Sequence, residues 1–117
     1  MTRDDDYIRE LLFKYEADED WLLLTPGETS GADQDEWKER GHVFLLMDEG
    51  LMARVANGTM RITSAGHDYI AVIRDDGIWK KTKEGAAQVG GVTLGIMKDI
   101  AVAYVKQTAA EKLGITL

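Results

Sequence analysis

The stretch that decides the fold is His42-Val43-Phe44-Leu45-Leu46-Met47-Asp48-Glu49-Gly50-Leu51-Met52. In it, an apolar run with helical character ends in glycine and passes at once into an apolar segment. Glycine just past the last apolar residue of a helix is a typical stop signal. The stretch therefore predicts a helix that ends at Gly50 and leads directly into a strand, with Leu46 and Leu51 in the core.

A β-hairpin is predicted next. Two short runs, Leu51–Val55 and Met60–Thr63, flank the segment Ala56-Asn57-Gly58-Thr59. The pair Asn57-Gly58 is the strongest short-range hairpin signal, because both residues tolerate the positive φ values of a type I′ turn. We therefore expect a two-stranded wing that folds back beside the helix.

An amphipathic helix is predicted near the N-terminus. Its apolar residues recur at spacings of three and four, and they are Tyr7, Ile8, Leu11, Leu12 and Tyr15. The run Asp4-Asp5-Asp6 before them supplies an N-cap and favourable charge at the positive end of the helix dipole. We expect this helix over about Asp5–Ala17.

Two features lie between that helix and the deciding stretch. Trp21–Leu24 is expected as a short buried strand or extended segment, followed by an exposed loop over residues 25 to 32. A second helical region begins near Asp33 or Asp35, either of which can cap it, and continues to Gly50. Gly41 inside it costs about 1 kcal/mol relative to alanine, which allows a break into two short helices.

Three more helices are predicted after the hairpin. Thr63 or Ser64 can cap the first, which runs to Arg74, and Asp76 can cap the second, which runs to about Gln88. Thr93 can cap the last helix, which Gly114 would end. The apolar residues of this last helix again recur at three and four: Leu94, Met97, Ile100, Ala101, Tyr104, Val105, Ala109 and Leu113.

The order helix, extended segment, helical pair, hairpin, helix is that of a winged helix-turn-helix. We therefore expect an α+β, mainly α fold: a winged helix-turn-helix-like core with a β-hairpin wing and added C-terminal helices. The 117 residues can bury one core and not two. Since no linker, repeat or low-complexity segment divides the chain, a single domain over residues 1–117 is expected.

Charge is distributed unevenly along the chain, which carries a net −7. Residues 1–37 hold three basic and twelve acidic side chains, residues 38–73 four of each, and residues 74–117 seven basic and five acidic. The acidity thus belongs to the N-terminal third. Such a chain lacks the overall basic footprint that phosphate neutralisation favours, so weak non-specific affinity for DNA is expected.

Composition also bears on location. The chain contains no cysteine, which excludes disulfides and thiolate metal sites and fits a reducing cytosol. No apolar run approaches the ~18 residues that span a bilayer. The acidic N-terminus has no stretch of signal-peptide type. A cytoplasmic protein that does not enter the membrane is expected.

The deciding stretch is similar to the His-Leu-x-x-Leu-x-x-x-Gly-Leu pattern of many winged-helix repressors, with Val43 in place of the first leucine. A second, more distinctive set of residues comprises Arg3-Asp4-x-Asp6-x-Ile8-Arg9, Arg61-Ile62-Thr63-Ser64-Ala65-Gly66-His67-Asp68-Tyr69-Ile70, Arg74-Asp75-Asp76 and Trp79-Lys80. With it, the chain resembles a family of small bacterial and phage proteins known only as the domain of unknown function number twenty-five thirteen. The resemblance implies a winged-helix-like fold and a mobile-element setting, with no established activity.

No motif of a catalytic, metal or cofactor site is present. The two histidines, His42 and His67, lie in no metal-ligand spacing, so a structural or surface role is expected for each. Neither Ser30 nor Ser64 lies in a nucleophile-elbow pattern. Gly90-Gly91 lacks the context of a phosphate loop. The chain is therefore expected to be no enzyme and to bind no cofactor or metal.

One group of residues could form an interaction face on the helix and the wing. Its members are Lys38, Arg40 and His42 on the helical region and Arg54, Asn57 and Arg61 on the wing. Helix side chains of this fold class enter the major groove and wing side chains touch phosphates or the minor groove. The alternative, which we favour, is ordinary solubilising charge, because nearby carboxylates would face the same phosphates.

The C-terminal helices offer other surfaces. Met97, Ile100, Tyr104 and Val105 can serve the core, yet a homodimer through these helices is nearly as well supported. The stretch Trp79-Lys80-Lys81-Thr82-Lys83 is either a cationic face toward a protein or a solvated helix with a buried tryptophan.

A winged-helix fold is typical of DNA-binding proteins, but this chain carries a net negative charge, which DNA would repel. The combination indicates a non-enzymatic interaction module of phage or mobile-element type, which binds an unknown protein partner. The competing hypothesis is a sequence-specific DNA-binding transcriptional regulator, whose local basic face overcomes the overall charge.

Overall fold

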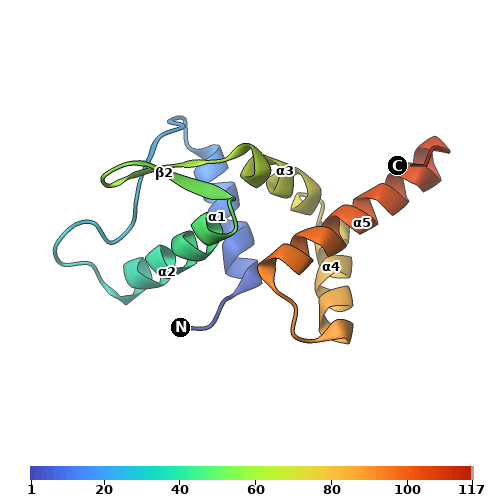
Figure 1. The fold of residues 1–117 in the computed structure, drawn as a ribbon, viewed down its shortest axis with the longest axis horizontal. Helices are drawn as coiled ribbons and strands as arrows, with labels where there is room; N and C mark the ends of the chain where they lie inside the picture. The colour runs from blue at the N-terminus through green and yellow to red at the C-terminus, as the bar shows by residue number, and fades with distance from the viewer. Residues whose placement is uncertain (117) are drawn as a thin grey trace. The chain divides into compact units, whose positions relative to one another are not determined.

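The computed structural model describes residues 1–116. The elements in chain order are α1 (Asp5–Ala17), β1 (Leu23–Leu24), α2 (Gln34–Asp48), β2 (Met52–Ala56), β3 (Thr59–Ile62), α3 (Ser64–Ile73), α4 (Asp76–Val89) and α5 (Leu94–Leu113) (Figure 1). The α+β, mainly α class is confirmed. The chain divides into two compact units, the first over Met1–Ile70 and the second from Ala71 onward.

Helix α1 forms as its sequence predicts. The backbone N–H of Tyr7 donates to the Asp4 Oδ1 across 3.0 Å, so Asp4 is the N-cap. The apolar face that the sequence indicated is buried: Ile8, Leu11, Leu12 and Tyr15.

Helix α2 is one continuous helix, so the break allowed at Gly41, and with it the helical pair, is wrong. Asp33 caps the helix by accepting from the Glu36 N–H at 2.9 Å. A glycine costs about 1 kcal/mol in a helix, less than the burial of the adjacent His42 and Val43 provides. Because glycine has no side chain, Met1 can pack close to the helix at Gly41, where a Cβ would lie 2.6 Å from the Met1 sulfur.

The end of α2 confirms the prediction that the helix ends at Gly50 and leads directly into a strand. The Leu51 N–H donates to the Leu46 carbonyl at 2.8 Å, the Gly50 N–H donates to the Met47 carbonyl at 3.0 Å, and Gly50 has φ +76°. These two bonds around a left-handed glycine form a Schellman motif, whose flanking apolar residues are Leu46 and Leu51. Both side chains are fully buried, as predicted.

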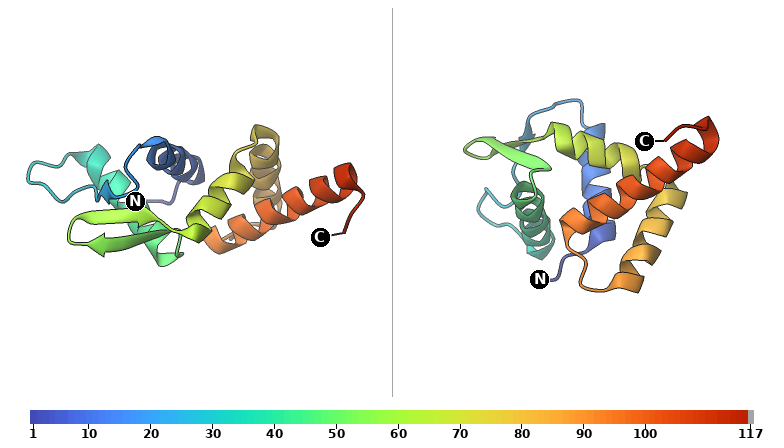
Figure 2. Two further views of the ribbon diagram at one scale, coloured as in Figure 1. Left: turned by 90° about the horizontal axis from the view of Figure 1, so that it is seen from above. Right: turned by 45° about the vertical axis from the view of Figure 1, so that its right-hand side comes forward.

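The strands form a three-stranded antiparallel sheet in the order β1-β3-β2. The tip of the β2–β3 hairpin lies at the periphery of its unit in every ribbon view (Figures 1 and 2). Gly58 has φ +75° but Asn57 keeps a negative φ, so the hairpin is confirmed and the type I′ turn is wrong. The register shifts between Arg54 and Ala56, and such an irregularity lets a different turn close the ribbon.

Strand β1 is shorter and more exposed than expected. Of Trp21–Leu24 only Leu23 is buried, against the inner face of the sheet, while 70% of Trp21 and 84% of Leu24 are exposed. The expectation of a buried segment is therefore wrong for all but Leu23. Alternate side chains of a strand point to opposite faces, so Leu24 points away from the face that buries Leu23, whereas Trp21 and Leu22 lie in the bend before the strand.

Helix α3 begins beside the α2–β2 junction. Thr63 Oγ1 accepts from the Gly66 N–H at 3.0 Å and donates to the Gly50 carbonyl at 2.6 Å. Ile62 and Ile70 are buried, as are Leu46 and Leu51.

The second unit is a helical hairpin in which α4 packs against α5 (Figure 2). Asp75 caps α4 by accepting from the Ile78 N–H at 2.9 Å, so the expected cap at Asp76 is wrong by one residue. Thr93 caps α5 and Gly114 ends it with φ +67°, both as predicted. Within residues 1–116, none of the helices is long and apolar enough to cross a membrane.

Candidate interaction surface

The cationic side chains of α2 are held by contacts within the first unit. Arg40 Nη1 donates to the Pro26 carbonyl at 2.9 Å and to Glu28 Oε1 at 3.2 Å, and its guanidinium lies 4.7 Å from the centre of the Phe44 ring. Arg40 thereby ties the loop before α2 to the helix. A Cβ on Gly27 would lie 2.7 Å from the Arg40 Cδ, and Gly27 has φ +79°, so the loop needs a glycine here.

Lys38 and His42 both contact Tyr7. The Lys38 ammonium lies 4.2 Å from the centre of the Tyr7 ring, and the His42 ring meets the same ring edge-on at 4.8 Å. His42 is fully buried. Of the residues expected on the interaction face, His42 is thus in the interior and offers no surface to a partner.

The hydrogen bonds of His42 fix its charge state. Its Nε2 accepts from the Asp4 N–H at 3.0 Å, and its Nδ1 lies 2.9 Å from the Lys38 carbonyl oxygen. Because an amide N–H only donates and a carbonyl only accepts, the proton is on Nδ1 and the ring is neutral. His42 is a structural histidine.

The wing residues lie on two sides of the ribbon. Arg61 is opposite Ala53 and Arg54 is opposite Met60 in the register, and residues directly opposite each other share a face. Consecutive residues such as Met60 and Arg61 point to opposite faces, so Arg54 and Arg61 do not lie together. Arg61 Nη1 donates to the Ile62 carbonyl at 3.2 Å.

Only part of the predicted face is exposed surface. Arg54 and Asn57 are exposed near the hairpin tip and Lys38 is exposed on α2, whereas Arg40 and Arg61 are partly buried. The structure therefore brings Lys38 and His42 together around Tyr7 but does not join all six residues into one basic face.

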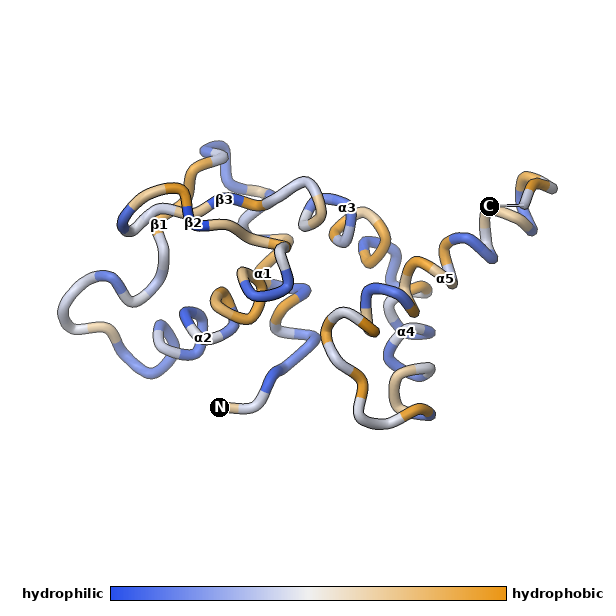
Figure 3. The backbone as a smooth tube through the Cα atoms, viewed as in Figure 1, coloured by the Kyte–Doolittle hydropathy of each residue, from blue (hydrophilic) through white to orange (hydrophobic). Residues whose placement is uncertain are grey.

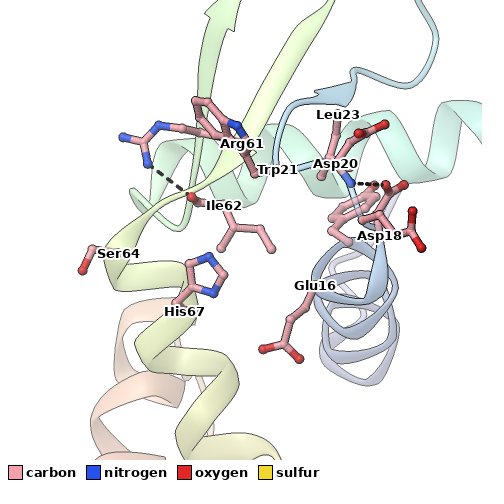
Figure 4. A pocket seen from close by; sticks show the side chains of 11 residues that line it. Glu16, Asp18, Asp20, Trp21, Leu23, Arg61, Ile62, Ser64 and His67 are labelled. Atoms are coloured by element: carbon pink, nitrogen blue, oxygen red, sulfur yellow. Dashed lines mark hydrogen bonds between the residues drawn. The ribbon is translucent and has the colours of Figure 1, made fainter.

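A different surface, which sequence reasoning missed, surrounds the segment from Asp18 to Leu24. On one side is a hollow of about 300 Å³ between the end of α1 and the β3–α3 junction. Figure 4 shows the Glu16 and His67 side chains on opposite sides of this hollow with Ile62 between them. On the other side a second hollow of about 310 Å³ is lined by residues that include Leu24 and Glu39.

Carboxylates dominate this surface. Asp18 Oδ1 accepts from the Asp20 N–H at 2.9 Å, which shapes the turn. Glu39 accepts from the Tyr15 hydroxyl and from the Lys14 ammonium, the latter at 3.2 Å. Burial, and then the hydrogen bond to Glu39, raise the pKa of Tyr15 well above its usual range.

The sequence did carry a signal for this surface. Three consecutive acids, Asp18-Glu19-Asp20, stand directly before the apolar run Trp21–Leu24. Figure 3 shows the same change from hydrophilic to hydrophobic along the tube where the turn after α1 enters β1. Within residues 1–116, no group of three His, Asp or Glu side chains is placed to hold a metal ion, at this surface or at another.

A family model described as a hypothetical protein (DUF2513) matches residues 2–93 of the chain. The chain belongs to the DUF2513 family. No curated protein and no solved structure gave a significant match.

The DUF2513 match covers the first unit and helix α4. It ends at Thr93, the N-cap of α5, so that α5 (Leu94–Leu113) lies beyond the matched residues. The residues that the family model matches include the segment Asp18–Leu24 and all six residues of the predicted interaction face. Both surfaces are therefore parts of the DUF2513 region of this chain.

Proposed function

We propose that the protein is a non-enzymatic, cytoplasmic interaction module of phage or mobile-element type, with a winged-helix-like core, which works by binding another protein. The observation that carries this proposal is the charge of the first unit. Residues 1–70 hold sixteen acidic and seven basic side chains, a net −9. Such a surface attracts basic protein surfaces and repels phosphates.

The contacts that the α2 cations make within the chain support the same proposal. In a winged helix that reads DNA, the helix before the wing presents its side chains to the major groove. Here Arg40 is bound to Pro26 and Glu28, Lys38 lies over Tyr7, and His42 is buried. The same helix carries four acids, Asp35, Glu36, Glu39 and Asp48. A DNA duplex would meet few free cations on α2.

A DNA-binding regulator is the second candidate, because Arg54 and Asn57 lie exposed at the wing and have no side-chain partner among residues 1–116. Titration of duplex DNA at several salt concentrations separates the two candidates. We expect dissociation constants no tighter than the roughly 10⁻⁴–10⁻⁶ M of non-specific binding at physiological salt. Sequence-selective, steeply salt-dependent binding that Arg54→Ala with Arg61→Ala abolishes would establish the regulator instead.

Protein binding itself is tested by purification of the tagged full chain from its native host with cross-linking, followed by reconstitution from purified components. A stoichiometric complex that weakens as salt rises is the expected result, because opposite charges would join the partners. A chain that forms no complex with any co-purified protein would contradict the proposal.

We also propose that the C-terminal helices can join two copies. Met97 is buried within the chain, and Ile100 and Tyr104 face Gly85 of α4, so these three residues serve the monomer. Ile96, Val102 and Leu113 on α5 are 41%, 37% and 67% exposed and are available to a second copy. Sedimentation equilibrium of the wild type and of Val102→Asp tests this, and a monomeric wild type at all concentrations would contradict it.

A further inference from the structure

The segment Asp18–Leu24 ends in a strand with a free edge. Strand β1 pairs with β3 only, in the order β1-β3-β2. The Thr25 N–H donates to the Gly58 carbonyl at 2.9 Å, toward β3. Because backbone groups of consecutive strand residues point to opposite sides, the N–H and C=O of Leu24 face the open edge. They are available to a further strand.

Large apolar side chains stand exposed along this edge. Trp21 is 70% exposed, Leu22 41% and Leu24 84%. Scattered exposed apolar residues are common on protein surfaces, but three within four consecutive residues concentrate exposed apolar area on one short segment, with Trp21 at one hollow and Leu22 and Leu24 at the other. The aromatic ring of Trp21 is the side chain best suited to anchor a partner.

Negative charge borders the apolar patch. Asp18, Glu19 and Asp20 precede Trp21, all three are exposed, and none has a cationic partner among residues 1–116. A second copy of the chain would bring a first unit that also carries −9, and a nucleic acid would bring phosphates. Charge complementarity therefore favours a cationic occupant over either of these.

We propose that the edge of β1, with Trp21, Leu22, Leu24 and the carboxylates of residues 18–20, binds an extended, basic segment of the protein partner. This inference rests on the proposed function and names the chemistry of its partner. The segment would add as a strand beside Leu24, since main-chain hydrogen bonds of this kind give affinity to extended peptides. Its apolar side chains would pack on Trp21 and Leu24, and its lysine or arginine side chains would lie near Glu19.

The probe for this proposal is a labelled synthetic peptide in which lysine and valine alternate, titrated against the full chain by fluorescence anisotropy. We expect saturable binding that weakens with salt, and none for the peptide with glutamate in place of lysine. Trp21→Ala should weaken binding about tenfold, as loss of an aromatic anchor does. Glu19→Lys should weaken it several-fold.

Matched variants separate this site from the rest of the surface. Trp37→Ala removes a tryptophan that is 54% exposed on α2, and Glu49→Lys reverses an exposed acid at the end of α2. Both should bind the peptide like the wild type. In two-dimensional NMR spectra, the amide of Leu24 should shift on peptide addition and gain protection from hydrogen exchange.

Several results would overturn the docking site. They are no binding of the lysine–valine peptide, equal binding by Trp21→Ala and Trp37→Ala, or amide shifts confined to residues outside 18–25. A change of oligomeric state in Trp21→Ala would show that a second copy covers the patch. A native complex that Trp21→Ala and Glu19→Lys leave intact would refute this site while protein binding stands, whereas sequence-selective DNA binding would refute both.

Discussion

His42 Nε2 accepts a hydrogen bond from the backbone N–H of Asp4 across 3.0 Å. On its other side, the same ring donates from Nδ1 to the carbonyl of Lys38, 2.9 Å away in its own helix. Since Asp4 is the residue that caps α1, the imidazole fixes the start of α1 against the middle of α2. The histidine links two helices whose contact residues are 38 positions apart in the sequence.

His42→Ala should destabilise the protein by about 2–4 kcal/mol, because it removes the acceptor of the Asp4 N–H and opens a cavity where the buried imidazole lay. The free energy of unfolding from urea titration measures the loss. His67→Ala is the control, since His67 is exposed on α3 and should change that free energy by less than about 0.5 kcal/mol. Equal stability of the two variants would contradict a structural role for His42.

The sequence was most informative where a local interaction decides the structure. Gly50 ends α2 where the sequence predicts, and Asp4, Asp33 and Thr93 cap the predicted helices. Each of these features depends on residues fewer than six positions apart, so a single chain segment contains the whole signal. The core residues Leu46 and Leu51 follow from the same local pattern.

Sequence reasoning failed where the structure depends on a contact between residues far apart in the chain, or on a choice between two neighbouring residues that are equally suitable. Nothing local shows that His42 meets Asp4, so its place in the interior could not be foreseen. Asp75 and Asp76 are equally good caps, and one residue of helix register separates them. Trp21 lies in the bend before β1, and a strand of two residues is too short to show in the sequence which of its side chains are buried.

Gly66 lies at a close approach of α3 to the α2–β2 junction. A Cβ there would lie 2.1 Å from the Leu51 carbonyl oxygen and 2.7 Å from Ile62 Cγ2. Because backbone cannot give way cheaply, Gly66→Ala should cost at least about 1–3 kcal/mol of stability. Gly41→Ala meets only the flexible Met1 side chain and should be neutral or stabilising by up to about 1 kcal/mol. Thermal unfolding of both variants checks the contrast, and a stable Gly66→Ala would show that α3 packs differently.

Thr63 makes two hydrogen bonds with one hydroxyl. It accepts from the Gly66 N–H at 3.0 Å and donates to the Gly50 carbonyl at 2.6 Å, so it caps α3 and binds the glycine that ends α2. Thr63→Ala should lower the free energy of unfolding by about 1–2 kcal/mol. Thr63→Ser keeps the hydroxyl and should recover most of the loss. If serine were as destabilising as alanine, the methyl group and not the hydroxyl would matter.

Tyr15 should make the stability of the protein sensitive to alkaline pH. In the folded chain, burial and the hydrogen bond to Glu39 raise the pKa of Tyr15 far above 10.0, whereas the unfolded residue ionises near that ordinary value. As pH rises above 10, the unfolded state loses a proton that the folded state keeps, so the free energy of unfolding must fall. The slope is about 1.4 kcal/mol per pH unit for one such group.

Tyr15→Phe removes this ionisation. At neutral pH the variant should be less stable by about 1 kcal/mol, because the hydrogen bond to Glu39 is lost. Above pH 10 the deficit should shrink and then reverse, since the phenylalanine has no proton to release. Urea titrations of both proteins from neutral to alkaline pH measure the difference, in which the deprotonation of lysines and of Tyr69 cancels. Parallel pH profiles would mean that the Tyr15 hydroxyl is not held against Glu39 in the folded protein.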